Sequence, residues 1–261
     1  MRLLALAALA VALAAQTKVA VTVVNPKTAQ AITGLKAADF VLLEDKKPRQ
    51  VQAAEYATFI VDIMLLLDTS LVGGMVRPLA DDLIAQLQPK EQMAIVAFHS
   101  SADLIQDFTS SRELLARAVA QVKFGNEPHV LDALYAAMDG GFQSSSFRRV
   151  ILLLTTGMEG SSRVSERQVL RLARRNAVSV FPLYVVGYER SFFENLARQS
   201  GGASFNLRDL RKGGERMAAR IFDVLRGHYV LSVSGNLALG EKVEVKVNRP
   251  EKLFVSALPL E

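Results

Sequence analysis

The sequence has no cysteine among its 261 residues and only three histidines. The absence of cysteine excludes disulfide bonds, thiolate metal sites, thiol nucleophiles and a lipid anchor attached through cysteine. Three histidines are too few for a histidine-rich metal centre. Proline and glycine are also scarce, at 8 and 16 residues, which argues against a fibrous or disordered chain. The folded state must therefore be stabilised by packing alone.

The charge surplus is small, and no hydrophobic run is long enough to cross a bilayer. The formal net charge is +5. The apolar run 3–15 follows Arg2 but is shorter than the ~20 residues of a membrane-spanning helix. With small residues at 12–14, this layout predicts a secretory signal peptide over residues 1–15. We expect an exported protein, periplasmic or extracellular, with no stable membrane insertion after cleavage; an uncleaved anchor is the alternative.

The two ends of the remaining chain have the pattern of β structure. Residues 16–57 contain short alternating segments separated by turns, and residues 228–261 alternate in the same way. Neither flank supplies enough strands for a core of its own, because two or three strands are marginal in water. We therefore predict that the N-terminal and C-terminal flanks pair into one small β-sandwich.

Between the flanks, residues 58–227 alternate between apolar strands and helix-length periodic segments. The runs 59–67, 93–98 and 149–154 are nearly continuous in apolar residues, as in strands buried on both faces of a parallel sheet. This alternation predicts an α/β fold with a doubly wound, mostly parallel sheet, inserted in the sandwich. Pro182 is a misfit in the predicted strand 178–186, because proline belongs at sheet edges or bulges.

Polar side chains follow the first and fourth predicted strands. Residues 68–70 read Asp-Thr-Ser and residues 155–157 read Thr-Thr-Gly. Ligands of open parallel sheets bind at the carboxyl ends of the strands, beside the point where the strand order reverses. These two loops are therefore the first place to look for a site.

The same stretches resemble a von Willebrand factor type A domain. The segments that carry the resemblance are 65–70, 87–98, 130–134 and 151–157. The flanking segment 34–45 and the terminal Tyr229-Val230-Leu231 are similar to a group of exported bacterial proteins in which this domain sits between short β segments. The resemblance implies a Rossmann-like sheet and a role in binding another protein.

The family's metal-ion-dependent adhesion site holds Mg²⁺ through an Asp-x-Ser-x-Ser loop, a threonine and a second aspartate. In this chain Asp68 and Ser70 match that pattern. His129 stands beside the threonine position. The three positions that depart from the pattern carry Val72, Pro128 and Thr156. A site with one carboxylate lacks the charge to compensate for removing water from Mg²⁺, which dehydrates reluctantly.

We therefore expect no cofactor, and no functional metal at Asp68, Ser70 and Thr156. Glu127 and Glu159 lie in the right loops but not at matching positions. Asp68 and Ser70 are instead interpreted as side chains that bond local backbone N–H groups. The residues expected to contact a partner are Ser70, Val72, Gly73, Glu127, His129 and Glu159.

The sequence thus predicts an exported, non-enzymatic protein-binding module with a degenerate metal site. One alternative is an Mg²⁺-dependent adhesion module that binds carboxylates, and a distant one is a hydrolase, although no Gly-x-Ser-x-Gly elbow is present. His99, His129 and His228 are expected at the surface or in turns. The arginines of segment 163–175 are interpreted as a solvated helix face, and contact with an acidic partner or an anionic membrane surface is the alternative. Without stacking aromatics they do not indicate nucleic-acid binding.

Overall fold

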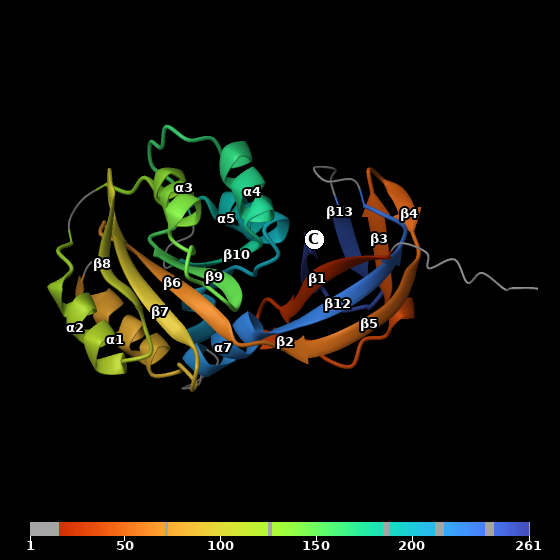
Figure 1. The fold of residues 1–261 in the computed structure, drawn as a ribbon, viewed down its shortest axis with the longest axis horizontal. Coiled ribbons are helices and arrows are strands. Elements are labelled where there is room, and N and C mark those ends of the chain that lie inside the picture. The colour runs from red at the N-terminus through yellow and green to blue at the C-terminus, as the bar shows by residue number, and fades with distance from the viewer. Residues whose placement is uncertain are drawn as a thin grey trace, which may run out of the picture.

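A computed structural model describes residues 16–70, 73–124, 127–184, 188–211, 217–237 and 243–260. The predicted signal peptide, 1–15, lies outside the described residues. Figure 1 shows an α/β body on one side of the molecule and a β body on the other.

The α/β body is built on a six-stranded sheet, which confirms the predicted doubly wound and mostly parallel arrangement. Its strand order is β11-β10-β9-β6-β7-β8. Only β8 runs antiparallel to its neighbour. The strands are β6 (Val61–Asp68), β7 (Gln92–Phe98), β8 (Ala102–Thr109), β9 (Arg148–Thr155), β10 (Val178–Tyr184) and β11 (Phe205–Asn206).

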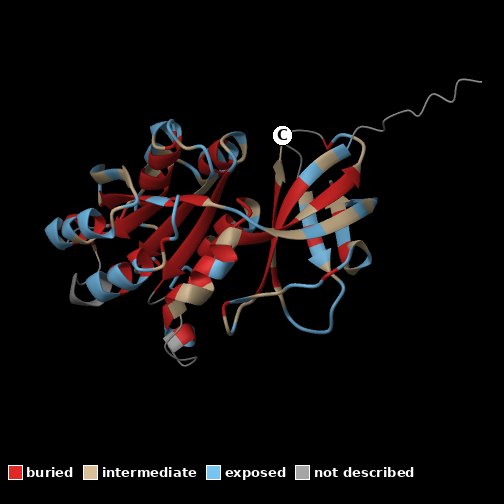
Figure 2. Cartoon of the chain, turned by 60° about the horizontal axis from the view of Figure 1, so that its bottom comes forward, coloured by how far each residue is buried: buried red, intermediate tan, exposed pale blue. Residues whose placement is uncertain are grey.

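Helices cover both faces of this sheet (Figure 1). One face carries α1 (Gly73–Ile84), α2 (Arg112–Gln121), α6 (Leu207–Arg211) and α7 (Met217–Arg226), and the other carries α3 (Val130–Gly140), α4 (Glu166–Arg175) and α5 (Arg190–Gln199). Alternate residues of β6 therefore enter different cores: Leu65 packs on one side and Leu66 on the other. This double burial, red in Figure 2, explains why the strand sequences are almost uninterrupted in apolar residues.

Strands from both ends of the chain pair with one another in the β body. One sheet has the order β14-β1-β12-β5, with β2 beside β1, and a second has the order β13-β3-β4. Side chains from both sheets, including Val21, Leu42 and Leu231, share one hydrophobic cluster. The elements are β1 (Gln16–Asn25), β2 (Gln30–Ala31), the 3-10 turn η1 (Ala37–Asp39), β3 (Phe40–Glu44), β4 (Lys47–Arg49), β5 (Val51–Thr58), β12 (Gly227–Ser234), β13 (Val243–Val247) and β14 (Phe254–Leu260).

The chain enters and leaves the α/β body at one place. Strand β5 ends at Thr58, which pairs with Gly227 at the start of β12, and the Phe59 N–H donates to the Arg226 carbonyl at 3.0 Å. A Cβ atom at Gly227 would lie 2.0 Å from the Tyr56 hydroxyl oxygen, so a larger residue there would have to displace the Tyr56 ring. The α/β body is thus connected to the flanks through two adjacent crossings.

Pro182 lies where its missing N–H costs nothing. Strand β11 pairs only with Leu183 and Tyr184, so the outer side of β10 is open at Pro182. The Val180 N–H, two residues earlier on the same side, donates to the Ser200 hydroxyl at 3.2 Å. The misfit in the sequence pattern is therefore a strand position with no ladder bond to lose.

Among the described residues, no helix combines the length and the apolar character needed to cross a bilayer.

Candidate functional site

The candidate site lies where β6 and β9 end side by side. The strand order reverses at β6, since β7 lies on one side of it and β9 on the other. Asp68 is the last residue of β6, and Thr155 is the last residue of β9. The two polar loops that the sequence singled out therefore follow neighbouring strands at the carboxyl edge of the sheet.

The Asp68 carboxylate is fully buried and has hydrogen-bond donors on both oxygens. Its Oδ1 accepts from the Ser70 N–H at 2.8 Å and the Ser70 hydroxyl at 2.6 Å. Its Oδ2 accepts from the Thr155 hydroxyl at 2.8 Å, and from the Thr156 N–H at 3.1 Å and hydroxyl at 3.3 Å. Asp68 therefore ties the ends of two neighbouring strands together.

Further hydrogen bonds extend this cluster to β7. Both the N–H and the hydroxyl of Thr69 donate to the Phe98 carbonyl at 3.0 Å. The Gly157 N–H donates to the Thr155 hydroxyl oxygen at 3.2 Å. The carboxyl ends of three adjacent strands are thereby fixed by side-chain and backbone polar groups.

These residues do not fit a bound Mg²⁺ ion. Asp68 is their single carboxylate, and both of its oxygens already accept hydrogen bonds from the chain. The described residues contain no group of three or more His, Cys, Asp or Glu side chains arranged to hold a metal. A cation at Asp68 would have to replace the hydrogen bonds from the Ser70 and Thr155 hydroxyl groups and give up its own hydration, while gaining the charge of a single carboxylate.

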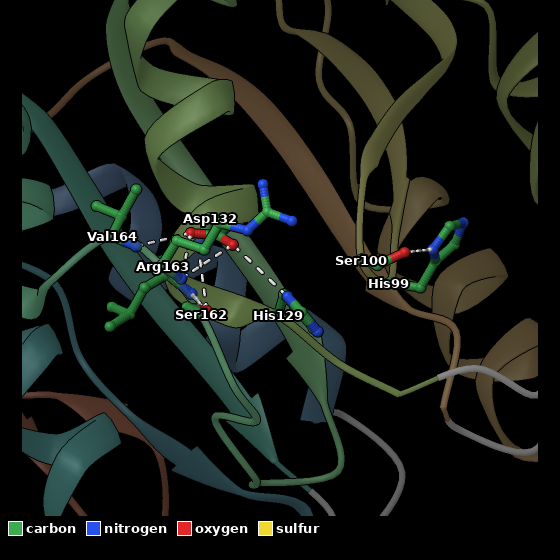
Figure 3. Close-up of polar contacts among 8 residues, drawn as sticks. His99, Ser100, His129, Asp132, Ser162, Arg163 and Val164 are labelled. Carbon is green, nitrogen blue, oxygen red and sulfur yellow. Dashed lines mark hydrogen bonds and ion pairs between the residues drawn. The ribbon is translucent and has the colours of Figure 1, made fainter.

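A second polar cluster joins the start of α3 to the loop after β9 (Figure 3). The Asp132 carboxylate accepts from the backbone N–H groups of Arg163 and Val164, at 3.0 and 2.9 Å. His129 Nδ1 lies 3.5 Å from Asp132 Oδ2. Burial acts to raise the pKa of Asp132, but the two backbone hydrogen bonds and His129 outweigh it, so this pKa lies below its ordinary value.

The loop before α3 and the loop after β9 are bonded directly to each other. His129 and Gly160 form a β-bridge, and the Val130 N–H donates to the Glu159 carbonyl at 3.1 Å. Gly160 has a φ of +84°, and a Cβ atom there would lie 1.8 Å from the Pro128 carbonyl oxygen. Glycine is therefore required for the loops to approach this closely.

The structure places most of the predicted contact residues at the carboxyl edge of the sheet, around Asp68 and the two bonded loops. Ser70 and Thr156 are half-buried at Asp68, while His129 and Glu159 lie in the paired loops. Glu127 is exposed beside them, and its neighbours 125–126 are not described. Gly73 begins α1. Val72 lies outside the described residues.

Two exposed apolar side chains at the carboxyl edge of the sheet were not among the residues predicted to contact a partner. Tyr188 is 78% exposed and Met158 is 47% exposed. Their loops are joined, because the Glu189 N–H donates to the Gly157 carbonyl at 3.1 Å and the Glu189 carboxylate accepts from the Glu159 N–H. The strand order could have indicated Tyr188, because this residue follows β10, the strand that pairs with β9. Thr155 and Asp132 were also missed as polar partners.

The expectation that all three histidines lie at the surface or in turns is wrong for His228. This residue is in β12 with 4% of its surface exposed, and its ring stacks on Phe59 at 4.3 Å. His129 is half-buried and paired with Asp132. His99 lies in the turn after β7, where its Nδ1 is 2.9 Å from the Ser100 hydroxyl oxygen (Figure 3).

Residues 62–216 match the family model of the von Willebrand factor type A domain. Among solved structures, an aerotolerance-related membrane protein from Bacteroides fragilis is similar to this chain at 11% identity and a TM-score of 0.51, covering 62% of this chain and 99% of that one. Proximal thread matrix protein 1 from the mussel byssus, solved with a zinc-occupied MIDAS motif, is similar at 18% identity and a TM-score of 0.55, covering 67% of this chain and 49% of that one. Identities this low show a shared fold alone. No curated protein matches the chain.

Proposed function

The chain belongs to the von Willebrand factor type A domain family, and from this premise we propose that it is a non-enzymatic module that binds another protein without a metal ion. The observation that carries the proposal is the state of Asp68. Its carboxylate accepts all of its hydrogen bonds from Ser70, Thr155 and Thr156. A carboxylate used in this way stabilises the binding face instead of capturing a cation.

The binding face consists of the joined loops at the carboxyl ends of the sheet. Met158 and Tyr188 supply apolar contact area there, and Glu127 and His129 supply polar groups beside them. Exposed aromatic and thioether side chains on a rigid polar support are typical of protein interfaces, where tyrosine is often an energetic anchor. This arrangement favours recognition of a protein surface over recognition of a single carboxylate.

The similar structures bear on this proposal in two ways. The mussel protein has a zinc-occupied MIDAS motif, whereas this chain keeps only part of the corresponding ligand set at Asp68 and Ser70. The Bacteroides fragilis protein is described as a membrane protein. Together with the predicted leader, that description supports export of this chain to the periplasm or beyond. We also propose that the flanks, 16–57 and 228–261, form a two-sheet sandwich carrying the domain 58–227.

The test is retention of proteins from the exported fraction on the immobilised protein, in EDTA and in millimolar Mg²⁺. We expect retention in both conditions and a loss of at least ~30-fold in affinity for Tyr188→Ala, the effect of removing an interface anchor. Phe147→Ala is the matched control, because Phe147 is an aromatic side chain, 39% exposed, that precedes β9 at the opposite end of the sheet from the binding face.

Retention that requires Mg²⁺ and is abolished by Asp68→Ala would contradict the proposal and favour the metal-dependent adhesion module. Turnover in a general esterase and phosphatase screen would contradict the non-enzymatic role.

A further inference from the structure

Helix α4 carries a row of arginines on its solvent side, continued by one arginine in the loop before it. We call this the arginine row: Arg163, Arg167, Arg171 and Arg175. All four side chains are exposed. On the helix they are four residues apart, so they share one face at a rise of about 6 Å per step. The opposite face of α4 is occupied, because Val169 and Leu172 pack into the core.

The arginine row has no partner within the described part of the chain. None of its four guanidinium groups makes an ion pair or hydrogen bond with another described residue. Other helices of this domain pair their arginines at the same spacing: Arg117 with Glu113 on α2 at 3.4 Å, and Arg190 with Glu194 on α5 at 2.7 Å. The sequence alone indicated a solvated face, whereas this contrast indicates that the positive charge on α4 is left open.

Arg167 and Arg171 are electrostatically unfavourable within their own helix, whereas Arg175 lies in the last turn, where a positive charge is favourable. Like charges four residues apart repel each other, and Arg167 in the first turn opposes the partial positive charge of the helix N-terminus. The local carboxylates do not relieve this, since Glu166 accepts a hydrogen bond from Asn195 and Asp132 is bonded to backbone. Functional surfaces commonly carry residues that lower the stability of the element that bears them.

We propose that the arginine row binds an acidic helix of the partner protein, with Asp or Glu side chains at four-residue spacing. Guanidinium groups bind carboxylates in a bidentate geometry, and equal spacing on two helices brings several such pairs together. Arg163 belongs to the same loop as Met158, so the arginine row is continuous with the binding face. This inference rests on the proposed function because it names the chemistry of that protein partner.

The arrangement of the four arginines favours a helix over a flat anionic surface. The arginine row follows a single line along α4, and carboxylates at four-residue spacing on a second helix match that line. A lipid bilayer requires no such spacing. Nucleic acid is disfavoured because the arginine row has no aromatic side chain for base stacking.

The probe is a synthetic alanine-based peptide with glutamate at every fourth position, labelled for fluorescence anisotropy. A peptide of the same composition with its glutamates adjacent tests the spacing. Vesicles rich in phosphatidylglycerol test the lipid alternative. We expect the spaced peptide to bind the protein more tightly than either competitor, and binding to weaken as salt is added.

Charge reversal at Arg167 and Arg171 should weaken peptide binding roughly tenfold or more. Arg167→Gln/Arg171→Gln should give a smaller loss. The matched control is Lys27→Glu/Lys123→Glu, which makes the same change of net charge at exposed positions outside α4 and should stay within about twofold. The Arg167→Glu/Arg171→Glu protein should melt no lower than the wild type, because the first new carboxylate would suit the helix N-terminus and the second would face Arg175.

Equal binding of both peptides, an equal loss in the lysine control, or tighter binding to vesicles would each overturn the inference. A failure of the proposed function can be distinguished from a failure of this inference. Tyr188→Ala should lower retention of the natural partner without changing binding of the synthetic peptide, so a defect in one assay leaves the other interpretable.

Discussion

Two buried polar side chains at opposite ends of β6 have contrasting environments. Asp68, at the carboxyl end, is a charge-bearing group with donors on both oxygens. His228 lies at the amino end against Phe59, and its Nδ1 is buried with no hydrogen-bond partner among the described residues. Burial alone therefore does not identify a functional group: the Asp68 side chain joins strands, and the His228 side chain is held by packing.

The environment of His228 excludes its charged form. Burial lowers the pKa of His228 to about 3, and the neighbouring positive charge of Arg148 contributes to this lowering. Arg148 is itself desolvated, which lowers its pKa to about 10; its guanidinium group donates to the Leu225 carbonyl and lies 5.8 Å from the Phe181 ring centroid. At the junction between the two bodies the neutral His228 imidazole therefore lies beside the Arg148 cation.

The largest expected effect is the loss of stability on breaking the hydrogen-bonded cluster at Asp68. Asp68→Ala leaves the buried Thr155 hydroxyl and the Thr156 N–H without an acceptor, and should lower the free energy of unfolding by about 3 kcal/mol or more. Denaturant unfolding followed by circular dichroism measures this. Thr156→Ala removes only a half-buried donor and should cost about 1 kcal/mol or less.

Asp68→Asn is the matched control, because the amide keeps one acceptor and the Thr155 hydroxyl can rotate to accept from the new NH₂ group. Its cost should fall between those of the other two variants. An Asp68→Ala protein as stable as the wild type would show that Asp68 does not join the strands.

The next effect in size is a loss of stability in mild acid caused by His228. Its folded pKa, about 3, lies below the ordinary value of 6.5, so between these values the unfolded chain binds a proton that the folded chain excludes. Stability is fully present above pH 6.5 and falls as the pH drops. From pH 7 to pH 5 the loss should be about 2 kcal/mol.

Urea unfolding at the two pH values measures this loss, and His228→Gln should remove about 2 kcal/mol of the difference. The lowered pKa of Asp132 does not interfere, because its contribution disappears only below the ordinary carboxyl value of 3.8. The same pH dependence in the wild type and His228→Gln would contradict the buried, neutral histidine.

The strands could be predicted from the sequence because burial on both faces leaves a continuous run of apolar residues in the chain itself. The continuous apolar run ending at Asp68 required helices on both faces, and the polar loops after two strands required a shared edge. The structure brings Asp68 and Thr156 together there, with 3.3 Å between Oδ2 and the Thr156 hydroxyl oxygen.

Contacts between residues far apart in the chain could not be predicted in this way, because no local sequence pattern accompanies them. His228 precedes Tyr229 in an alternating segment, and its burial arises from Phe59 and Arg148, which are remote in sequence. The buried ion pair between Arg226 and Glu91, at 2.7 Å, joins α7 to the loop before β7 in the same way. The role of Thr155 could not be predicted either, since a threonine hydroxyl in a strand gives no sign that it will meet a carboxylate.

The smallest expected effect is that of divalent cations on thermal stability. A site with micromolar affinity would gain about 2.7 kcal/mol at a hundredfold excess of Mg²⁺, enough to raise Tm by about 5–10 °C in a domain of this size. The Asp68 cluster should give less than about 1 °C with millimolar Mg²⁺ or Mn²⁺ in differential scanning fluorimetry, because a cation would have to replace hydrogen bonds that already satisfy both carboxylate oxygens. Asp68→Ala serves as the reference: a rise in Tm that occurs in the wild type and disappears in this variant would show that the carboxylate can release its donors and hold a metal ion.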